Sequence, residues 1–470
     1  MSRMRHLAAW APAAAAAIVL AACGGSHATG SRTAASASTG ASRTAAPRGA
    51  TSPTTTTPQV QGGDWPTYHR VSARTGVAPA GPALGRARRL WAATVDGAVY
   101  AEPLVVNNVV IVATENDSVY VLNATSGQQL WHTHLGTPVP GGDLPCGNID
   151  PSGITGTPVI DTTTKTVYAV TFTRFEHRLV ALDLVTGHVR WQRPIDPPGA
   201  DPRTHQQRAA LALSRQRVYV PYGGLYGDCG DYHGWVLAAP ASGPTGRLLG
   251  YQVPTAREGA IWAPSGPAID AAGNVYVATG NGASSSSFDF GNAVIRLTPT
   301  LRVTGFFAPS DAPALSGQDL DLGSTGPLLL PGHRAFIVGK TGVGYLLDAD
   351  GLGGIGGSLA SARICGAAFG GDAYANRTIY VPCTDGIAAV RVTGDRLARV
   401  WSQGAAQLPP ILAGPGLWAL SGGGTLFQLD PQSGQVRFSV SIGEPAHFAT
   451  PAASGGRIFV AAGGRVFAFG

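Results

Sequence analysis

Two aspartates separated by a single residue, Asp319 and Asp321, are the side chains of this sequence best suited to chemistry. One carboxylate could bind a hard cation such as Ca²⁺, which prefers oxygen ligands, while the other accepts a proton as a general base. The alternative is that both side chains cap turns, which aspartate does readily. The sequence shows no Ser-His-Asp order, phosphate-binding loop or nucleophile elbow, so it does not indicate those kinds of catalysis.

A histidine in the run Tyr232-His233-Gly234-Trp235 is a second candidate for a base or a metal ligand. Metal sites need several ligands at suitable spacing, and Cys229 is the one other ligand type close to His233 in the sequence. We therefore favour a structural role for His233, at the start of a strand.

Five cysteines occur in the chain. One of them, Cys23, belongs to the N-terminal signal described below, which leaves four for the folded body. An even number of cysteines in an oxidising compartment predicts two disulfides. Of the three possible pairings we favour Cys146 with Cys229 and Cys365 with Cys383, because each pair falls in neighbouring units of the repeat described below.

The N-terminus has the pattern of a secretion signal over residues 1–22. Arg3 and Arg5 precede an apolar, alanine-rich stretch over residues 7–22, which is short for a membrane span. The stretch ends in Leu20-Ala21-Ala22-Cys23-Gly24, which resembles the bacterial lipobox, whose cysteine is lipidated and becomes the new N-terminus. The alternative is an ordinary cleaved signal with an incidental cysteine. We expect an extracytoplasmic protein held at the membrane by a lipid on Cys23.

Residues 23–63 consist almost entirely of Ala, Ser, Thr, Gly and Pro, including the run Thr54-Thr55-Thr56-Thr57-Pro58. Such a segment has too few large apolar side chains to repay the entropy of ordering. We expect a disordered tether that begins at the lipidated cysteine, followed by a folded body over residues 64–470.

Composition excludes several classes of protein. Only 13% of the 470 residues are charged, which disfavours coiled coils, whereas 65 Gly and 35 Pro indicate frequent turns. The net charge of +6 is concentrated in the first fifty residues, which contain five arginines and no Asp or Glu. The folded body is therefore close to neutral, and we expect no nucleic-acid partner.

Short strands repeat along the folded body in the same order. In one unit, strands are expected over residues 109–113, 118–123 and 129–135, joined by polar turns, with a further strand near Leu104. The last strand of each unit carries an aromatic residue. These aromatic residues are Trp91, Trp131, Trp191, Tyr251, Phe306, Trp401 and Phe438.

The spacing of these aromatic residues predicts the number of units. The longest gap, between Phe306 and Trp401, must hide one unit, and the period is then about fifty residues, which suits four-stranded propeller blades. The strand over residues 89–92 has no unit before it, while the final copy over residues 457–469 lacks its outermost strand. We predict an all-β protein, an eight-bladed β-propeller whose ring is closed by the N-terminal strand, with seven blades as the alternative.

The units have the form Val-Tyr-x-Leu-Asn/Asp-x-x-x-Gly-x-x-x-Trp, which resembles the PQQ-type repeat of quinoprotein-dehydrogenase-like propellers over residues 65–470. In alcohol dehydrogenases of that family, the cofactor pyrroloquinoline quinone (PQQ) lies on the propeller axis between a Trp and a disulfide of two adjacent cysteines. A Ca²⁺ ion there is held by Glu, Asn and Asp. The resemblance implies that Trp262 and Asn281 bind the cofactor, that Asn281 and Asp319 bind the metal, and that Asp319 and Asp321 are catalytic.

The sequence departs from the pattern of those enzymes at three points. It has no adjacent cysteines, no carboxylate over residues 169–173, where the calcium Glu would be sought, and no Cys-x-x-Cys-His haem site. Glu176 is the substitute for the missing Glu, and electrons would need an external acceptor. Because one propeller scaffold also serves assembly lipoproteins and plain binding modules, the fold does not decide the function.

We expect a monomeric module of the cell envelope that binds a small ligand or an envelope protein through its axial channel or its rigidly held loops. The alternative is a PQQ- and Ca-dependent quinoprotein dehydrogenase that oxidises alcohols or sugars. That alternative would require PQQ and Ca²⁺ as cofactors.

Overall fold

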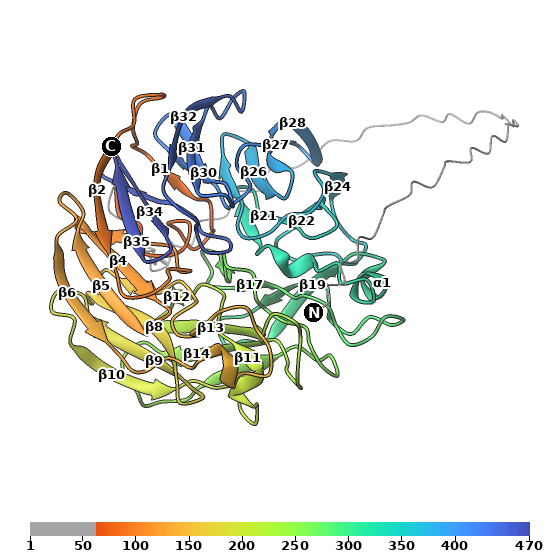
Figure 1. Cartoon of the computed structure of the whole chain (residues 1–470). Helices are drawn as coiled ribbons and strands as arrows, with labels where there is room; N and C mark the ends of the chain where they lie inside the picture. The colour runs from red at the N-terminus through yellow and green to blue at the C-terminus, as the bar shows by residue number, and fades with distance from the viewer. Residues whose placement is uncertain (1–62) are drawn as a thin grey trace, which may run out of the picture. The chain divides into compact units, whose positions relative to one another are not determined.

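The computed structural model describes residues 63–470. The predicted signal peptide, Cys23 and the predicted tether up to residue 62 lie outside the described residues. The described part is all-β, as predicted, and its strands form eight sheets (Figure 1). It also contains the short helix α1 (Ala312–Ser316) and the 3-10 turns η1 (Gly141–Asp143), η2 (Pro202–Thr204) and η3 (Leu322–Ser324). No helix in residues 63–470 is long and apolar enough to cross a membrane.

Each sheet is one blade with a core of four antiparallel strands, so the prediction of eight blades is confirmed. The blades are numbered here in chain order, and their strands are given from the inner to the outer edge. Blades 1 to 4 consist of β3 (Leu104–Val106), β4 (Val109–Thr114), β5 (Ser118–Asn123) and β6 (Gln129–His134); β7 (Val159–Asp161), β8 (Thr166–Thr173), β9 (Glu176–Asp183) and β10 (Val189–Pro194); β12 (Ala212–Ser214), β13 (Arg217–Gly224), β14 (Trp235–Pro240) and β15 (Leu249–Gln252); and β16 (Ala268–Ile269), β17 (Val275–Ala278), β18 (Val294–Leu297) and β19 (Val303–Ala308).

The other four blades have the same strand order. Blades 5 to 8 consist of β20 (Leu328–Leu330), β21 (Arg334–Val338), β22 (Val343–Asp348) and β24 (Ala360–Arg363); β25 (Ala373–Ala375), β26 (Thr378–Cys383), β27 (Gly386–Thr393) and β28 (Arg396–Gln403); β29 (Ile411–Ala413), β30 (Gly416–Leu420), β31 (Thr425–Leu429) and β32 (Val436–Ser441); and β33 (Ala452–Ser454), β34 (Arg457–Ala462), β35 (Arg465–Phe469) and β2 (Arg89–Thr94). The two-residue strands β1 (Val77–Ala78), β11 (His205–Gln206) and β23 (Gly354–Ile355) pair with β29, β13 and β19.

The sequence repeat arises from a contact between the outer strand of one blade and a turn of the next. In the turn after β9, the Asp183 carboxylate accepts the backbone N–H groups of the two residues that follow Leu184. Gly187 ends this turn at φ +74°, and a Cβ atom there would lie 2.6 Å from the ring of Trp131 in blade 1. Trp131 Nε1 donates to the Leu184 carbonyl at 3.0 Å. The repeated Asp, Gly and Trp therefore join one blade to the next.

The aromatic residues used to count the blades lie on the outer strands, as predicted. The hidden unit is blade 5, whose outer strand β24 has the sequence Ala-Ser-Ala-Arg and therefore carries no aromatic residue. Closure of the ring is also confirmed, because β2 pairs antiparallel with β35, with Trp91 opposite Ala468. The first outer strand of the chain thus completes the last blade.

The residues just before β2 have a role that the repeat did not predict. Residues 65–78, called the plug segment below, lie against the inner edges of the blades. One residue of each inner strand β3, β7, β16, β20, β25 and β29 donates its N–H to a carbonyl of the plug segment, at 2.8–3.1 Å. These donors are Val105, Ile160, Ile269, Leu329, Tyr374 and Leu412. Inner strands are sheet edges with unpaired N–H groups, so the plug segment satisfies them and closes the axis.

Buried polar side chains fix the plug segment in place. Arg74 is 2% exposed and donates to the carbonyls of Pro267, Leu211 and Tyr68 and to the Thr67 hydroxyl. Burial lowers the pKa of Arg74 to about 10, which keeps the guanidinium charged at neutral pH. Charged groups are rarely buried without such partners. Arg74 therefore cross-links the plug segment to blades 3 and 4.

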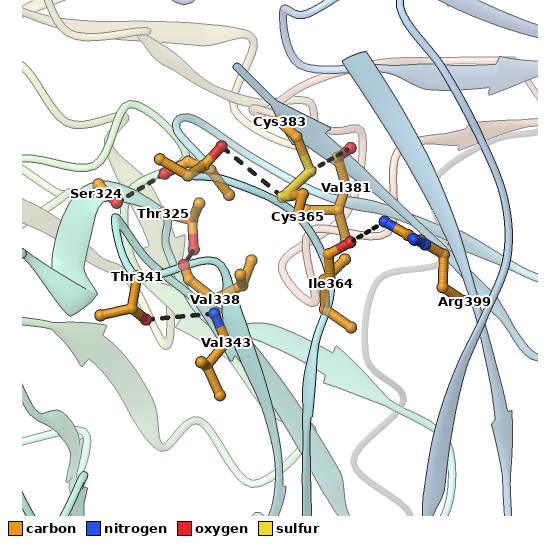
Figure 2. Close-up of a disulfide and its surroundings, with 12 residues drawn as sticks. Ser324, Thr325, Val338, Thr341, Val343, Ile364, Cys365, Val381, Cys383 and Arg399 are labelled. Atoms are coloured by element: carbon orange, nitrogen blue, oxygen red, sulfur yellow. Dashed lines mark hydrogen bonds between the residues drawn. A yellow bond between two sulfur atoms is a disulfide. The ribbon is translucent and has the colours of Figure 1, made fainter. Parts of the chain in front are cut away.

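The two disulfides have the favoured pairing. Cys146, between β6 and β7, is bonded to Cys229, between β13 and β14. Cys365, which follows blade 5, is bonded to Cys383 at the end of β26 in blade 6. Figure 2 shows this second disulfide beside Arg399, whose Nη1 donates to the Ile364 carbonyl at 3.1 Å. Two disulfides indicate an oxidising, extracytoplasmic compartment.

Candidate functional site

A cavity of about 370 Å³ lies at one end of the propeller axis. In every blade the connection between the second and third strands and the connection to the next blade lie at the same end, because neighbouring strands run antiparallel. These connections supply the cavity walls. The lining residues used below are Arg208, Tyr226, Tyr232, Trp262, Asn281, Asp319, Asp321, Lys340, Phe369 and Phe448.

The plug segment closes the axis below this cavity. Tyr68 of the plug segment and Arg208 together line a smaller space of about 10 Å³, and Arg208 also lines the larger cavity. The large cavity therefore opens at the end of the axis away from the plug segment.

Three aromatic rings from three different connections form the apolar wall of the cavity. Trp262 lies 6.4 Å from Phe369 and 6.1 Å from Phe448, measured between ring centroids. Phe369 and Phe448 are stacked at 5.7 Å with an interplanar angle of 13°. Rings arranged in this way offer flat faces to a planar ligand.

The Cys146–Cys229 disulfide holds the rim of the cavity on one side. Asn148 follows Cys146 by two residues, and Tyr226 precedes Cys229 by three, and both line the cavity. Tyr226 is 70% exposed, which places a large ring at the mouth. The disulfide therefore ties two rim loops from different blades together.

An ion-paired cluster lies at the opposite wall. Lys340 Nζ is 2.7 Å from Asp319 Oδ1 and 2.6 Å from Asp321 Oδ2. Asn281 joins both aspartates, because its backbone N–H donates to Asp321 Oδ1 at 2.7 Å and its side-chain Nδ2 donates to Asp319 Oδ1 at 2.8 Å. Asn292 completes the network by donating to Asn281 Oδ1 at 3.2 Å.

The two aspartates of this cluster differ in exposure and in protonation. The Asp321 side chain is 9% exposed, and its burial raises its pKa against the attraction of Lys340. The Asp319 side chain is 72% exposed, and its Oδ2 makes no hydrogen bond within residues 63–470. Burial alone would lower the pKa of Lys340, but the two carboxylates outweigh that effect and raise it. Lys340 is therefore a permanent cation in this site.

Gly280 brings the cluster against the aromatic wall. A Cβ atom at Gly280 would lie 2.4 Å from Asp321 Oδ1 and 3.1 Å from Trp262 Nε1. Any larger residue would push the carboxylate and the indole apart. The predicted run Thr279-Gly280-Asn281 thus positions both Asn281 and its neighbours.

Arg208 is the other cation of the cavity, and it has no protein partner. Its guanidinium lies over the Phe448 ring at 4.8 Å and over the Tyr100 ring at 6.0 Å. It makes no hydrogen bond or ion pair with any residue in 63–470. Burial lowers the pKa of Arg208, and the charges of Tyr100 and Glu115 partly offset this effect. Burial of a charged group without a partner is unfavourable unless something else pairs with it.

Two buried acids follow β4 near Arg208. Glu115 Oε2 accepts the Gly153 N–H at 2.7 Å and the Thr155 hydroxyl at 3.1 Å, and burial raises the pKa of Glu115 to about 7. Burial likewise raises the pKa of Asp117 to about 8. One oxygen of each carboxylate has no hydrogen-bond partner among the described residues. These acids are therefore protonated over much of the neutral range, which leaves Arg208 as the dominant charge at the cavity floor.

The four residues predicted to form the site are brought together, since Trp262, Asn281, Asp319 and Asp321 all line the one cavity. Glu176, the predicted substitute for a calcium ligand, is at the start of β9 and pairs with Arg178 instead. It does not line the cavity.

His233 lies near the same end of the axis. Its backbone N–H donates to His205 Nε2 at 3.3 Å, and its own Nδ1 is buried without a partner among the described residues. It is not among the cavity-lining residues, which agrees with the structural role favoured for it.

Lys340, Arg208 and Phe448 were not found from the sequence. A signal for Lys340 existed, because the chain has only two lysines among its 33 basic residues and Lys340 comes directly after a strand and a glycine. Arg208 and Phe448 have no such signal. They precede the first strands of blades 3 and 8, and only the ring brings them together.

The residues present do not fit a bound Ca²⁺ ion. The ammonium of Lys340 already stands between the two carboxylates, and the Asn281 amide points its NH₂ group, not its oxygen, at Asp319. Calcium requires six to eight oxygen ligands. Within residues 63–470, the one group of three His, Cys, Asp or Glu ligand atoms close enough for a metal contains Cys365 and Cys383, which are bonded to each other.

The same residues fit a planar anionic ring system better than they fit the metal. Trp262 and Phe448 supply flat faces, and Arg208 supplies an unpaired positive charge. PQQ is a ligand of this chemical type. There is no disulfide of adjacent cysteines to cover its second face.

Comparison with known proteins agrees with this architecture. Residues 84–227 match the family model described as outer membrane protein assembly factor BamB. A polyvinylalcohol dehydrogenase of a Pseudomonas species is 25% identical over 303 residues, which are 55% of this chain. The match covers 44% of that relative, so the chain spans less than half of its length.

Two solved structures illustrate the range of the fold. A quinohemoprotein alcohol dehydrogenase of Pseudomonas putida superimposes with a TM-score of 0.69 at 14% identity, over 87% of this chain and 80% of that chain. BamB of Moraxella catarrhalis superimposes with a TM-score of 0.56 at 15% identity, over 82% of this chain and 99% of that chain. At these identities the structural matches show the fold alone.

The eight blades, the repeated Asp, Gly and Trp contact and the family match identify one class of protein, the PQQ-like β-propellers. The chain is a member of this family and is related both to BamB and to quinoprotein alcohol dehydrogenases.

Proposed function

We propose that the propeller is a binding module of the cell envelope that takes a small organic anion with a planar ring into its axial cavity. The observation that carries the proposal is Arg208, a guanidinium that enters the cavity beside the Phe448 ring without any acceptor from the described residues. An anionic group of a ligand would supply the missing acceptor, since carboxylates and phosphates match the fork of an arginine.

The aromatic wall supports the same ligand class. Trp262, Phe369 and Phe448 would pack against a planar ring while Arg208 holds its charged group. Most small-molecule sites combine an apolar cavity with a few polar groups that fix orientation. The predicted lipid on Cys23 would keep such a module at the membrane surface.

Calorimetry and tryptophan fluorescence test the proposal on the purified protein. PQQ and simple aromatic dicarboxylates serve as probes, with their neutral amides as controls. We expect the acids to bind and to quench Trp262, and Arg208→Met to weaken binding at least tenfold. Trp262→Phe identifies the quenched ring, because the chain has nine tryptophans. Equal binding of acids and amides, or no binding of any probe, would refute the proposal.

A second candidate function is a PQQ-dependent dehydrogenase. It is favoured by the curated relative named as a polyvinylalcohol dehydrogenase and by the free Oδ2 atom of Asp319 at the cavity. Bound PQQ would supply the oxidising chemistry, and Asp319 would accept the proton of an alcohol. Trp262 and Arg208 would hold the ring and its charge.

A dye-linked assay with alcohols and sugars separates the two candidates. A dehydrogenase predicts dye reduction that needs PQQ and that Asp319→Asn abolishes while PQQ binding persists. Tight PQQ binding without dye reduction would leave the binding module as the function.

A further inference from the structure

We infer that the ammonium of Lys340 replaces a divalent cation in the Asn281, Asp319 and Asp321 cluster, so that the site needs no metal and a single neutral substitution at Lys340 turns it into a calcium site. The inference rests on the position of one nitrogen atom. Nζ of Lys340 lies 2.7 Å from Asp319 Oδ1 and 2.6 Å from Asp321 Oδ2, at the point where the two carboxylates converge.

The charges of the cluster leave no room for both cations. Two carboxylates balance one divalent ion, and Lys340 already neutralises half of their charge from the position that such an ion would need. An ion placed beside the ammonium would meet a like charge at close range in a site that is only partly exposed to water. Calcium is therefore excluded by occupation and by repulsion together.

The backbone holds Lys340 in this position. Its N–H donates to the Asp321 carbonyl at 2.8 Å directly after β21, and its side chain is 19% exposed. A surface lysine pays entropy to hold one geometry, but here the backbone bond and two carboxylates fix both ends of the side chain. The ammonium is therefore part of the folded site.

The type of residue agrees with the role. The chain uses Lys at only two of its 33 basic positions. An ammonium is a compact point charge, whereas a guanidinium is a planar fork that could not fit between two converging oxygens in the same way. Lysine is thus the side chain that most closely imitates a small cation.

Asn281 provides a fourth observation. Its Nδ2 group faces Asp319, and its Oδ1 atom accepts from Asn292 at 3.2 Å. Rotation of this amide would present an oxygen to an ion at the Lys340 position at the cost of the bond from Asn292. The oxygen set of a calcium site is therefore available once the ammonium is removed.

The test is ion binding to wild type and to Lys340→Met. Tb³⁺ is the luminescent probe, because Trp262 and Asp321 both approach Gly280 and the indole can therefore sensitise an ion held there. Ca²⁺ is then used to displace Tb³⁺, and Tm is measured in 10 mM Ca²⁺ against a chelator.

Wild type is expected to show no sensitised luminescence and the same Tm in calcium and in chelator. Lys340→Met is expected to bind Ca²⁺ with a Kd of about 0.1–1 mM, the range of extracellular calcium modules, and to gain about 2 °C in Tm. The matched control Lys165→Met changes the other lysine, which is exposed, and should behave as wild type. The double variant Lys340→Met with Asp321→Asn should lose the ion again.

Three outcomes would overturn the inference. Wild type might be imagined to fail first: stoichiometric Ca²⁺ binding that Asp321→Asn removes would show that Lys340 does not replace the ion. A folded Lys340→Met that ignores Ca²⁺ would show that the oxygen set is not a latent site. If Lys340→Met and the milder Lys340→Gln both fail to fold even with Ca²⁺ present, an ion cannot substitute for the ammonium, whereas folding that returns with Ca²⁺ supports the inference.

Discussion

The two ends of the propeller axis contain buried arginines in opposite situations. At the closed end, Arg74 of the plug segment donates to four acceptors and is almost inaccessible to water. At the open end, Arg208 enters the cavity with a ring of Phe448 beside it and no acceptor from the described residues. The closed end therefore holds the blades together, whereas the open end leaves its charge available to a ligand.

Replacement of Arg74 should have the largest effect on this contrast. Arg74→Met removes the four donated hydrogen bonds and leaves the carbonyls of Pro267 and Leu211 buried without donors. We expect the free energy of unfolding to fall by about 3–5 kcal/mol. Denaturant unfolding followed by circular dichroism measures the change.

The matched control is Arg86→Met, because Arg86 is exposed and makes no side-chain hydrogen bond in the described part of the chain. Its stability should stay within about 0.5 kcal/mol of wild type. Equal losses in both variants would show that the plug segment contributes no more than an ordinary surface residue.

A smaller effect is expected at Glu115, whose pKa is raised by burial from 4.5 in the unfolded chain to about 7. An acid with a raised folded pKa stabilises the protein fully below the unfolded value and loses that contribution as pH rises through the folded value. The loss should run from about pH 4.5 to pH 7 and reach about 3 kcal/mol. Glu115→Gln keeps an acceptor for the Gly153 N–H and should remove this part of the pH dependence.

Asp183→Asn is a control of opposite sign. Hydrogen bonds from Arg190 and from the Thr186 N–H lower the pKa of Asp183, so its contribution is present above the unfolded value and lost on acidification. Stability measured from pH 4 to pH 8 should therefore improve at high pH in Glu115→Gln and decrease at high pH in Asp183→Asn. The same slope in Glu115→Gln and wild type would contradict the assigned role of Glu115.

The smallest effect on stability is expected at Arg208. Arg208→Met removes an unpaired charge and a contact with the Phe448 ring, two changes of opposite sign, so the free energy of unfolding should change by less than about 1 kcal/mol. Thermal unfolding measures the change alongside Arg74→Met. A loss as large as that of Arg74→Met would mean that Arg208 holds the fold and would remove the distinction between the two ends.

The blades could be predicted because the contacts that create the repeat are local. Asp183, Gly187 and Trp131 join consecutive blades, and their spacing in the sequence records this contact. The closing strand was predicted for the same reason, since an outer strand without its blade remains visible at the start of the chain. The plug segment was missed because its six hydrogen bonds go to six different blades and leave no period in the sequence.

The candidate site was predicted only where a resemblance pointed to it. Trp262, Asn281, Asp319 and Asp321 lie in one cavity, but their ion pair with Lys340 was not foreseen. Arg208 and Phe448 come from connections on different sides of the ring, and no sequence pattern relates residues at that separation. The cavity floor could be seen only after the ring had been closed.

The plug segment also determines the order in which the molecule can be assembled. Its carbonyls receive N–H groups from inner strands as distant in sequence as Val105 and Leu412, so its binding surface does not exist until seven blades are in place. Contacts between such distant residues form slowly, whereas each blade can fold from neighbouring strands. The first ordered residues of the chain are therefore among the last to reach their native positions, and pulse-labelled hydrogen exchange should find the N–H groups of Val105 and Leu412 protected together and late.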